Sequence, residues 1–235
     1  MALPLYLAMT AAEISQSRQM PAHCAYMACH FSPYETGLSN IPQELPKGSL
    51  LILNDRTPVL GHDPDLIAQQ LSQAAEVREA DGVLLDFQRP GQPETHEIAR
   101  AIVSALTCPV AVSEHYANDL DCSVFLSPPP LDRSLSAYIK PWQGRDIWLE
   151  AALDTIAIQV TEKGSRQVLV PYKPGAPLHT DTRLHCNYRI CAQPDQVMFT
   201  LERDANNLSA LLEEAAVLGI ARAVGLYQEL GSHFQ

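Results

Sequence analysis

Short apolar runs alternate with amphipathic helical stretches along most of this chain. Runs of apolar residues bounded by polar or turn-forming residues are typical of buried strands, whereas apolar residues spaced three and four apart indicate helices. Parallel strands need long, usually helical, crossover connections, so this alternation predicts βα units around a parallel sheet. The predicted strands are 3–9, 24–31, 49–54, 82–88, 108–113, 122–127, 146–151 and 221–227, and the clearest helices are 64–80, 94–106 and 206–218.

Eight predicted strands in 235 residues fit one particular closed architecture. A chain of this length can form a single core, and an eight-stranded α/β barrel lies close to it at its compact end. We therefore predict an α/β fold, a compact (β/α)8 TIM barrel that forms one domain over residues 1–235.

One stretch near the C-terminus interrupts the alternation. Residues 155–162, 167–170, 184–191 and 197–202 read as strands without helical character, with a turn at Lys163-Gly164-Ser165. Successive strands separated by short turns are typical of β-hairpins. We predict a small antiparallel β insertion at about 154–204, between the seventh barrel strand and its helix.

The composition excludes several classes of function. A formal net charge of -11 argues against a broad surface for nucleic acid or anionic lipid. No apolar run approaches the ~18–20 residues of a membrane span. Residues 1–10 carry no preceding Lys or Arg and predict a strand rather than a secretion signal, so we expect a cytoplasmic protein, with secretion left open for a processed N-terminus.

The cysteines and known motifs predict no metal and no cofactor. Two C-x4-C spacings, Cys24 to Cys29 and Cys186 to Cys191, lie in predicted strands, where residues five apart point to opposite faces. Buried thiols are the expected state. The chain has no G-x-G-x-x-G, P-loop, G-x-S-x-G or H-E-x-x-H motif.

The fourth predicted strand has the most informative sequence, Asp81-Gly82-Val83-Leu84-Leu85-Asp86-Phe87-Gln88-Arg89-Pro90. Side chains alternate along a strand, so Leu84, Asp86 and Gln88 share one face with Gly82. The opposite face is wholly apolar and suits packing under helices. In a barrel, this arrangement places Gln88 at the carboxyl-end mouth, where active sites of such barrels lie.

This segment resembles the fourth-strand signature of family 18 glycoside hydrolases, the chitinase family, which reads D-G-apolar-D-apolar-D-aromatic-E before a proline. The β insertion is a second point of similarity. The resemblance implies that the position of Gln88 belongs to the acid that protonates the glycosidic oxygen, and that Asp86 orients the substrate's N-acetyl group. Leu84 replaces the middle Asp and Gln88 the Glu, which implies loss of chitinase-type hydrolysis.

Other positions also depart from that family. Its third strand usually ends in Ser-x-Gly-Gly, where this chain has Asn54-Asp55-Arg56. Its sixth carries Met-x-Tyr-Asp, where this chain has Leu126-Ser127-Pro128. Its eighth ends in a Trp beneath the sugar, where this chain has Tyr227, which can still stack on a sugar face.

Polar residues at the predicted strand ends complete the set of candidates, because these ends meet at the mouth of a barrel. Asp86, Gln88 and Glu114 are the candidate catalytic positions. The predicted ligand-binding residues are Tyr34, Glu35, Asn54, Asp55, Arg89, His115, Tyr116, Glu150 and Tyr227.

Three functions remain open at this point. The first is a family 18-like barrel that lacks chitinase-type hydrolysis and binds an oligosaccharide, another small ligand or a protein partner. The second is an active glycosidase or other hydrolase with relocated carboxylates, Glu114 with His115 or Glu35 being the first to consider. The third is an unrelated barrel enzyme that acts on a small metabolite.

Overall fold

The computed structural model describes residues 2–59, 61–169 and 176–234. The chain divides into two compact units. The first, the barrel unit, comprises Pro4–Ser127, Gly144–Glu150 and Ile220–Gln235. The second, the insertion unit, comprises Met1–Leu3, Pro128–Gln143 and Ala151–Gly219. That the whole chain acts as a single domain stays a prediction.

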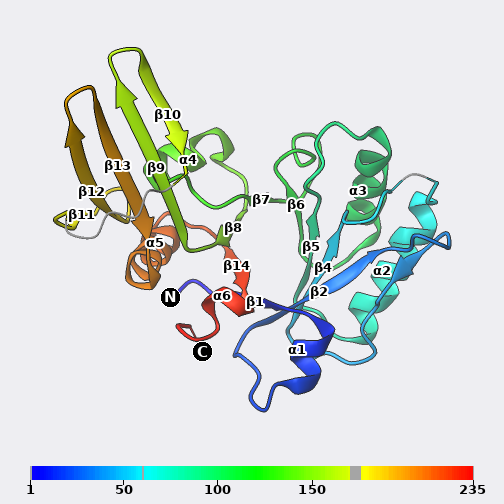
Figure 1. The fold of residues 1–235 in the computed structure, drawn as a ribbon. Coiled ribbons are helices and arrows are strands. Elements are labelled where there is room, and N and C mark those ends of the chain that lie inside the picture. The colour runs from blue at the N-terminus through cyan, green and yellow to red at the C-terminus, as the bar shows by residue number, and fades with distance from the viewer. Residues whose placement is uncertain (1, 60, 170–175, 235) are drawn as a thin grey trace. The chain divides into compact units, whose positions relative to one another are not determined.

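Eight parallel strands form a closed barrel in the barrel unit (Figure 1), which confirms the predicted fold class. The strands pair in the order β1-β14-β8-β7-β6-β5-β4-β2, and pairing of β1 with β2 closes the ring. A short strand, β3 (Leu38–Ser39), adds antiparallel to β2. The barrel strands are β1 (Leu5–Met9), β2 (Cys24–Phe31), β4 (Leu50–Asn54), β5 (Gly82–Asp86), β6 (Val110–Ser113), β7 (Ser123–Leu126), β8 (Ile147–Ala151) and β14 (Arg222–Leu226).

Helices follow four of these strands within the same unit. They are α1 (Ala11–Gln16), α2 (Pro64–Val77), α3 (Pro93–Ala105) and α6 (Tyr227–Leu230). Helix α2 begins where the sequence favours it, because Asp63 accepts a hydrogen bond from the backbone N–H of Asp65 and Pro64 takes the first helical position. Its buried face carries Ile67 and Leu71 at helical spacing.

Large side chains fill the barrel interior at the amino ends of its strands. Trp148 is buried there, with the guanidinium carbon of Arg222 4.7 Å from its ring centroid. Arg222 also forms an ion pair with Asp81, 3.1 Å from nitrogen to oxygen. Smaller apolar side chains, including Leu84 of β5, belong to the same interior cluster as Trp148, as the strand alternation predicts.

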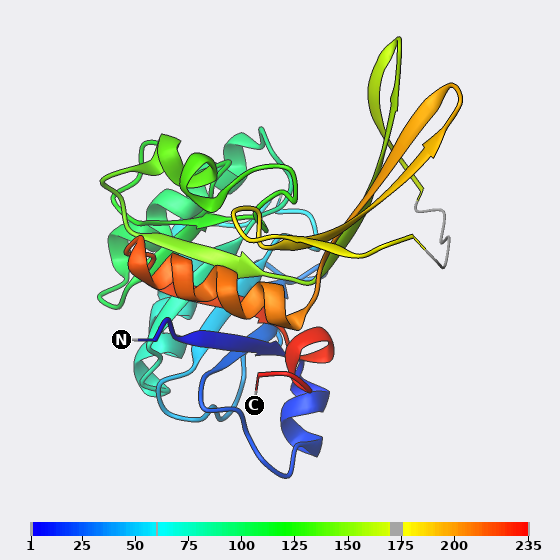
Figure 2. The same ribbon diagram turned by 90° about the vertical axis from the view of Figure 1, so that its left-hand side faces the viewer.

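The insertion unit contains a five-stranded antiparallel sheet in the order β10-β9-β13-β12-β11. The predicted hairpins are present as β9–β10 and β12–β13, and Figures 1 and 2 show β9 and β13 side by side, which joins both hairpins in one sheet. Strand β11 was not predicted, and residue 170 of the predicted 167–170 lies outside the described residues. The strands are β9 (Asp154–Thr161), β10 (Gly164–Val168), β11 (His179–Asp181), β12 (Cys186–Gln193) and β13 (Gln196–Arg203).

The described residues of the insertion unit also form three helical segments: α4 (Leu135–Ile139), the 3-10 helix η1 (Lys140–Trp142) and α5 (Ala205–Val217). Its apolar core gathers around buried Leu131, Cys186 and Leu201. None of the helices that the structure describes is both long and apolar enough to cross a membrane.

Candidate active site at the barrel mouth

A cavity of about 530 Å³ opens at the carboxyl ends of the barrel strands. Its apolar lining includes Ile52, Leu84 and Phe125, which belong to the inner layer of the barrel. Its size and mixed lining are those of a small-molecule site. The ionisable and amide side chains that line it are His30, Asn40, Asn54, Asp55, Arg56, Asp86, Gln88, Arg89 and Glu150.

Asp86, the last residue of β5, and Gln88, two residues later, both line this cavity. The Gln88 side chain donates a hydrogen bond from Nε2 to Oδ1 of Asp86. Burial raises the pKa of the Asp86 carboxyl, the hydrogen bond from Gln88 opposes this rise, and the charge of Asp55 adds to it. Leu84 is buried two residues earlier on the same face of β5, so no carboxylate lies below Asp86 on that strand.

Asp55 fixes the backbone at the start of the segment that follows β5. It is buried, and its two carboxylate oxygens accept the backbone N–H groups of Gln88 and Arg89, each at 3.0 Å. Hydrogen bonds to an ionised acceptor are among the stronger ones in proteins. Asp55 therefore holds the position of Gln88 rather than presenting free oxygens to a ligand.

Asn54 serves the neighbouring strand in a similar way. Its Nδ2 donates to the backbone carbonyls of Met27 at 3.2 Å and Cys29 at 3.1 Å. These carbonyls flank the place where the pairing register of β2 with β4 shifts, between Tyr26 and Cys29. A shift of this kind leaves ladder groups unpaired, so Asn54 stabilises the irregular backbone beside the cavity.

Glu150 brings a second carboxyl group to the cavity from β8. Burial, followed by the charges of Asp86 and Glu229, raises its pKa to about 7. A carboxyl with this pKa is protonated in a large fraction of molecules at neutral pH, and it can then donate a hydrogen bond or a proton.

The structure brings half of the predicted site residues together. Asn54, Asp55, Asp86, Gln88, Arg89 and Glu150 line the cavity. Tyr34, Glu35, Glu114, His115, Tyr116 and Tyr227 are not among its lining residues.

Those six residues lie elsewhere in the barrel unit. Tyr34 is 94% exposed, and the backbone N–H of Glu35 donates to Ser32 Oγ. Glu114 accepts from Ser127 Oγ at 3.4 Å, and His115 follows it in the turn after β6. Tyr116 is buried and donates its hydroxyl to the backbone carbonyl of Arg89. Tyr227 is the first residue of α6.

Four polar lining residues were not among the predicted site residues: Thr10, His30, Asn40 and Arg56. Thr10 directly follows β1, so the rule that polar residues gather at strand ends would have found it. His30 lies within β2 and lines the cavity, after the shift in pairing register between Tyr26 and Cys29. This shift could not be predicted from the sequence. Among the residues that the structure describes, no three His, Cys, Asp or Glu side chains group as metal ligands would.

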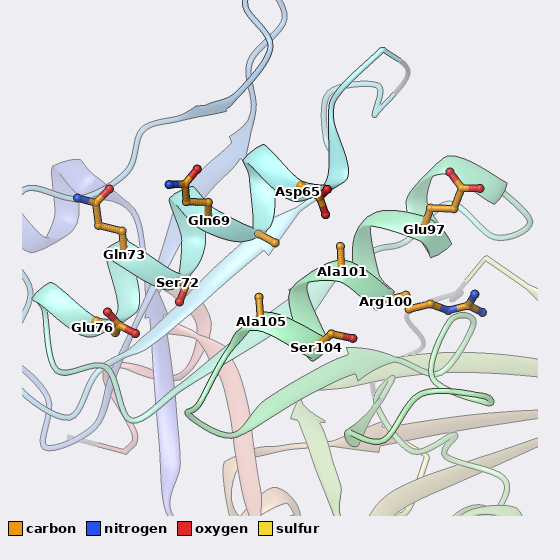
Figure 3. Close-up of a pocket in the computed structure, with 11 residues that line it drawn as sticks. Asp65, Gln69, Ser72, Gln73, Glu76, Glu97, Arg100, Ala101, Ser104 and Ala105 are labelled. Atoms are coloured by element: carbon orange, nitrogen blue, oxygen red, sulfur yellow. The ribbon is translucent and has the colours of Figure 1, made fainter.

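A second hollow, of about 830 Å³, lies on the outer side of the barrel unit between α2 and α3 (Figure 3). Small side chains such as Ala101 and Ser104 line it together with charged ones at its edges. It contains none of the predicted site residues, and Arg100 in its lining already pairs with Asp119 at 2.8 Å. The barrel mouth is therefore the better candidate for a functional site.

Comparisons with known proteins agree with this architecture. No protein-family model matches the sequence, and no curated protein matches it. Among solved structures, the chitinase ChiW from Paenibacillus sp. str. FPU-7 is similar with a TM-score of 0.63 and 12% identity, over 99% of this chain and 42% of that one. A family 18 N-acetylglucosaminidase from Paenibacillus barengoltzii is similar with a TM-score of 0.57 and 11% identity, over 95% and 94% of the two chains.

A third similar structure is a double mutant of the family 18 chitinase of Cycas revoluta in complex with (GlcNAc)4. One of its two substitutions replaces a glutamate by glutamine. It has a TM-score of 0.57 and 12% identity, over 95% of this chain and 94% of that one. At these identities the similarity shows the fold, and it confirms the predicted likeness to family 18 barrels at that level.

Proposed function

We propose that the barrel mouth binds carbohydrate and that the protein lacks chitinase-type hydrolysis. The observation that carries this proposal is the amide of Gln88, which is hydrogen bonded to Asp86 in the position where the family 18 signature has its acid. A carboxamide cannot donate a proton to a leaving oxygen. Loss of a general acid lowers a rate by roughly 100- to 10,000-fold.

The cavity retains features that suit a sugar. Phe125 and Leu84 offer apolar surface, while Gln88 and Asp86 present a donor and acceptors for hydroxyl groups. The Cycas revoluta chitinase variant supports the idea from another direction, because it holds (GlcNAc)4 with a glutamine in place of one glutamate.

One observation favours a second candidate, an active glycosidase with a relocated acid. Glu150 lines the same cavity as Asp86 and has a pKa raised to about 7, which suits a proton donor at neutral pH. Glu114 and Glu35, the relocated carboxylates considered first, do not line the cavity. In this candidate, Glu150 takes the role of acid from the β8 side of the mouth.

Calorimetric titration with N-acetylglucosamine oligomers separates these functions. Saturable heat that ends after each injection is expected for binding, and Gln88→Leu should weaken that binding about tenfold because it removes hydrogen bonds to the sugar. Gln73→Leu, an exposed change on α2 outside the mouth, serves as the control.

Continuing heat flow that Glu150→Gln abolishes would establish the second candidate instead. No heat with any oligomer would overturn the proposal that the mouth binds such sugars.

A further inference from the structure

We propose that the sugar bound at the barrel mouth carries a carboxylate, which Arg56 and Arg89 hold. This inference rests on the proposed carbohydrate binding and names the class of sugar. Both arginines line the cavity, Arg56 from the segment that follows β4 and Arg89 from the segment that follows β5, and these two strands pair in the barrel.

The two arginines are linked to each other. Nη2 of Arg89 donates to the backbone carbonyl of Arg56 at 2.8 Å. The backbone N–H of Arg56 donates to Oδ1 of Asn54 at 3.1 Å. A guanidinium has five N–H donors, so this one bond leaves most of the fork of Arg89 open to a ligand.

The backbone of Arg89 is held on both sides. Its N–H donates to Asp55, and its carbonyl accepts the hydroxyl of the buried Tyr116. Tyr116 in turn accepts the backbone N–H of Gln92 at 3.2 Å. Binding to a group whose backbone is already fixed loses less conformational entropy, so this anchoring favours a specific contact.

Neither guanidinium has an acidic partner within the described part of the chain, although the protein has a net charge of -11. Two of the three carboxyl groups that line the cavity accept hydrogen bonds from other groups. Asp55 accepts two backbone N–H groups, and Asp86 accepts the amide of Gln88. Two cations without a counter-charge in a ligand cavity favour an anionic ligand, and the planar fork of arginine matches a carboxylate in particular.

The acidic side chains that face the arginines do not prevent this. Burial, followed by the charges of Asp86 and Glu229, raises the pKa of Glu150 to about 7, so part of the negative charge of Glu150 is removed near neutral pH, and the carboxylate of Asp86 already accepts the amide of Gln88. His30 is the remaining ionisable side chain in the lining, and its Nδ1 lies 2.9 Å from the carbonyl of Ala28. An anionic sugar therefore meets a positive rim on the β4 and β5 side of the mouth.

The test compares two tetrasaccharides of equal length by calorimetry. One is a hyaluronan tetrasaccharide, which alternates N-acetylglucosamine with glucuronic acid, and the other is neutral chitotetraose. The hyaluronan tetrasaccharide should bind at least about tenfold more tightly, since hydrogen bonds to charged groups are the stronger ones. The double variant Arg56→Gln/Arg89→Gln should abolish this preference, so that its affinities for the two tetrasaccharides differ by less than about threefold.

A matched control removes the same charge elsewhere. Arg18→Gln/Arg133→Gln changes two exposed arginines outside the cavity and should keep the preference for the acidic sugar. Equal affinity for the two sugars, or a preference that survives in Arg56→Gln/Arg89→Gln, would overturn the inference while leaving carbohydrate binding in place. Tighter binding of a sulfated chitotetraose would reassign the arginines to a sulfate group. Absence of binding by either tetrasaccharide would remove both proposals.

Discussion

Gly82 has no space for a side chain at the first position of β5. A Cβ atom there would lie 2.8 Å from the carbonyl oxygen of Pro109 and 2.9 Å from the ring of Trp148. Real Cβ contacts are longer, so the backbone or the Trp148 ring would have to move. The glycine of the family 18-like signature is thus explained in this chain by packing at the amino end of the barrel.

Gly82→Ala should therefore destabilise the barrel unit by about 1–3 kcal/mol, the usual cost of overpacking a filled interior. Urea unfolding followed by tryptophan fluorescence measures this change. Gly37→Ala is the matched control, because its Cβ would meet only the end of the flexible Gln70 side chain. An unchanged unfolding midpoint for Gly82→Ala would contradict the packing described here.

Single residues at the mouth were predictable where a strand has regular alternation. Asp86 and Gln88 line the cavity as the pattern of residues 82–88 predicts. Tyr116 shows why other candidates differ: it follows β6 in sequence, but its ring is buried and its hydroxyl bonds to backbone. A polar residue after a strand can equally well hold a neighbouring segment, and only tertiary contacts decide between these roles.

Helices and strands were predicted correctly wherever they were long enough to show a periodic pattern of apolar residues. The eight barrel strands, α2, α3 and α5 all lie within a few residues of their predicted positions. The segments α1 (Ala11–Gln16), β3 and β11 are too short to show a periodic pattern of apolar residues, and tertiary contacts stabilise them. The pairing of β9 with β13 joins segments far apart in sequence, which local patterns do not specify.

Helix α5 depends on a capping residue that also contacts the sheet of the insertion unit. Asp204 accepts the backbone N–H of Asn207 at 2.9 Å, and it also accepts the side chain of Asn187 at 2.9 Å. Asp204→Ala should lower the free energy of unfolding by about 1–2 kcal/mol, because it removes the cap and leaves Asn187 without this partner. Glu213→Ala, at an exposed position of the same helix, is the control for thermal unfolding. Equal melting temperatures for the two variants would argue against this capping role.

At the scale of the whole molecule, the pairings that close the barrel carry the fold. Strand β1 pairs with β14 on one side and β2 on the other, although β14 is near the opposite end of the chain. The sequence allowed eight strands to be counted, but their register was not predictable from local patterns. This also explains how solved structures with 11–12% identity share the fold, since many apolar side chains can satisfy the same pairing.

The stability of the barrel unit should depend on pH through Glu150. Its pKa rises from 4.5 to about 7 in the folded chain, so between these values the folded protein binds a proton that the unfolded chain has released. The stabilising contribution of protonated Glu150 is therefore fully present below about pH 4.5, and it is lost as the pH rises through about 7. Asp86, whose pKa burial also raises, acts in the same direction.

Glu150→Gln replaces this carboxyl by a neutral amide and should abolish its share of the loss. We expect the variant to be more stable than the wild type by about 2 kcal/mol at pH 8, allowing for partial solvent screening, and equally stable at pH 4. Urea unfolding at the two pH values measures the difference. Glu76→Gln, at an exposed position of α2, should change neither value. The opposite result would be a Glu150→Gln variant that is as stable as the wild type at pH 4 and less stable than it at pH 8. Folding would then favour the ionised carboxylate of Glu150. In that case Glu150 could not serve as a proton donor at neutral pH, and the negative charge at the mouth would not be reduced.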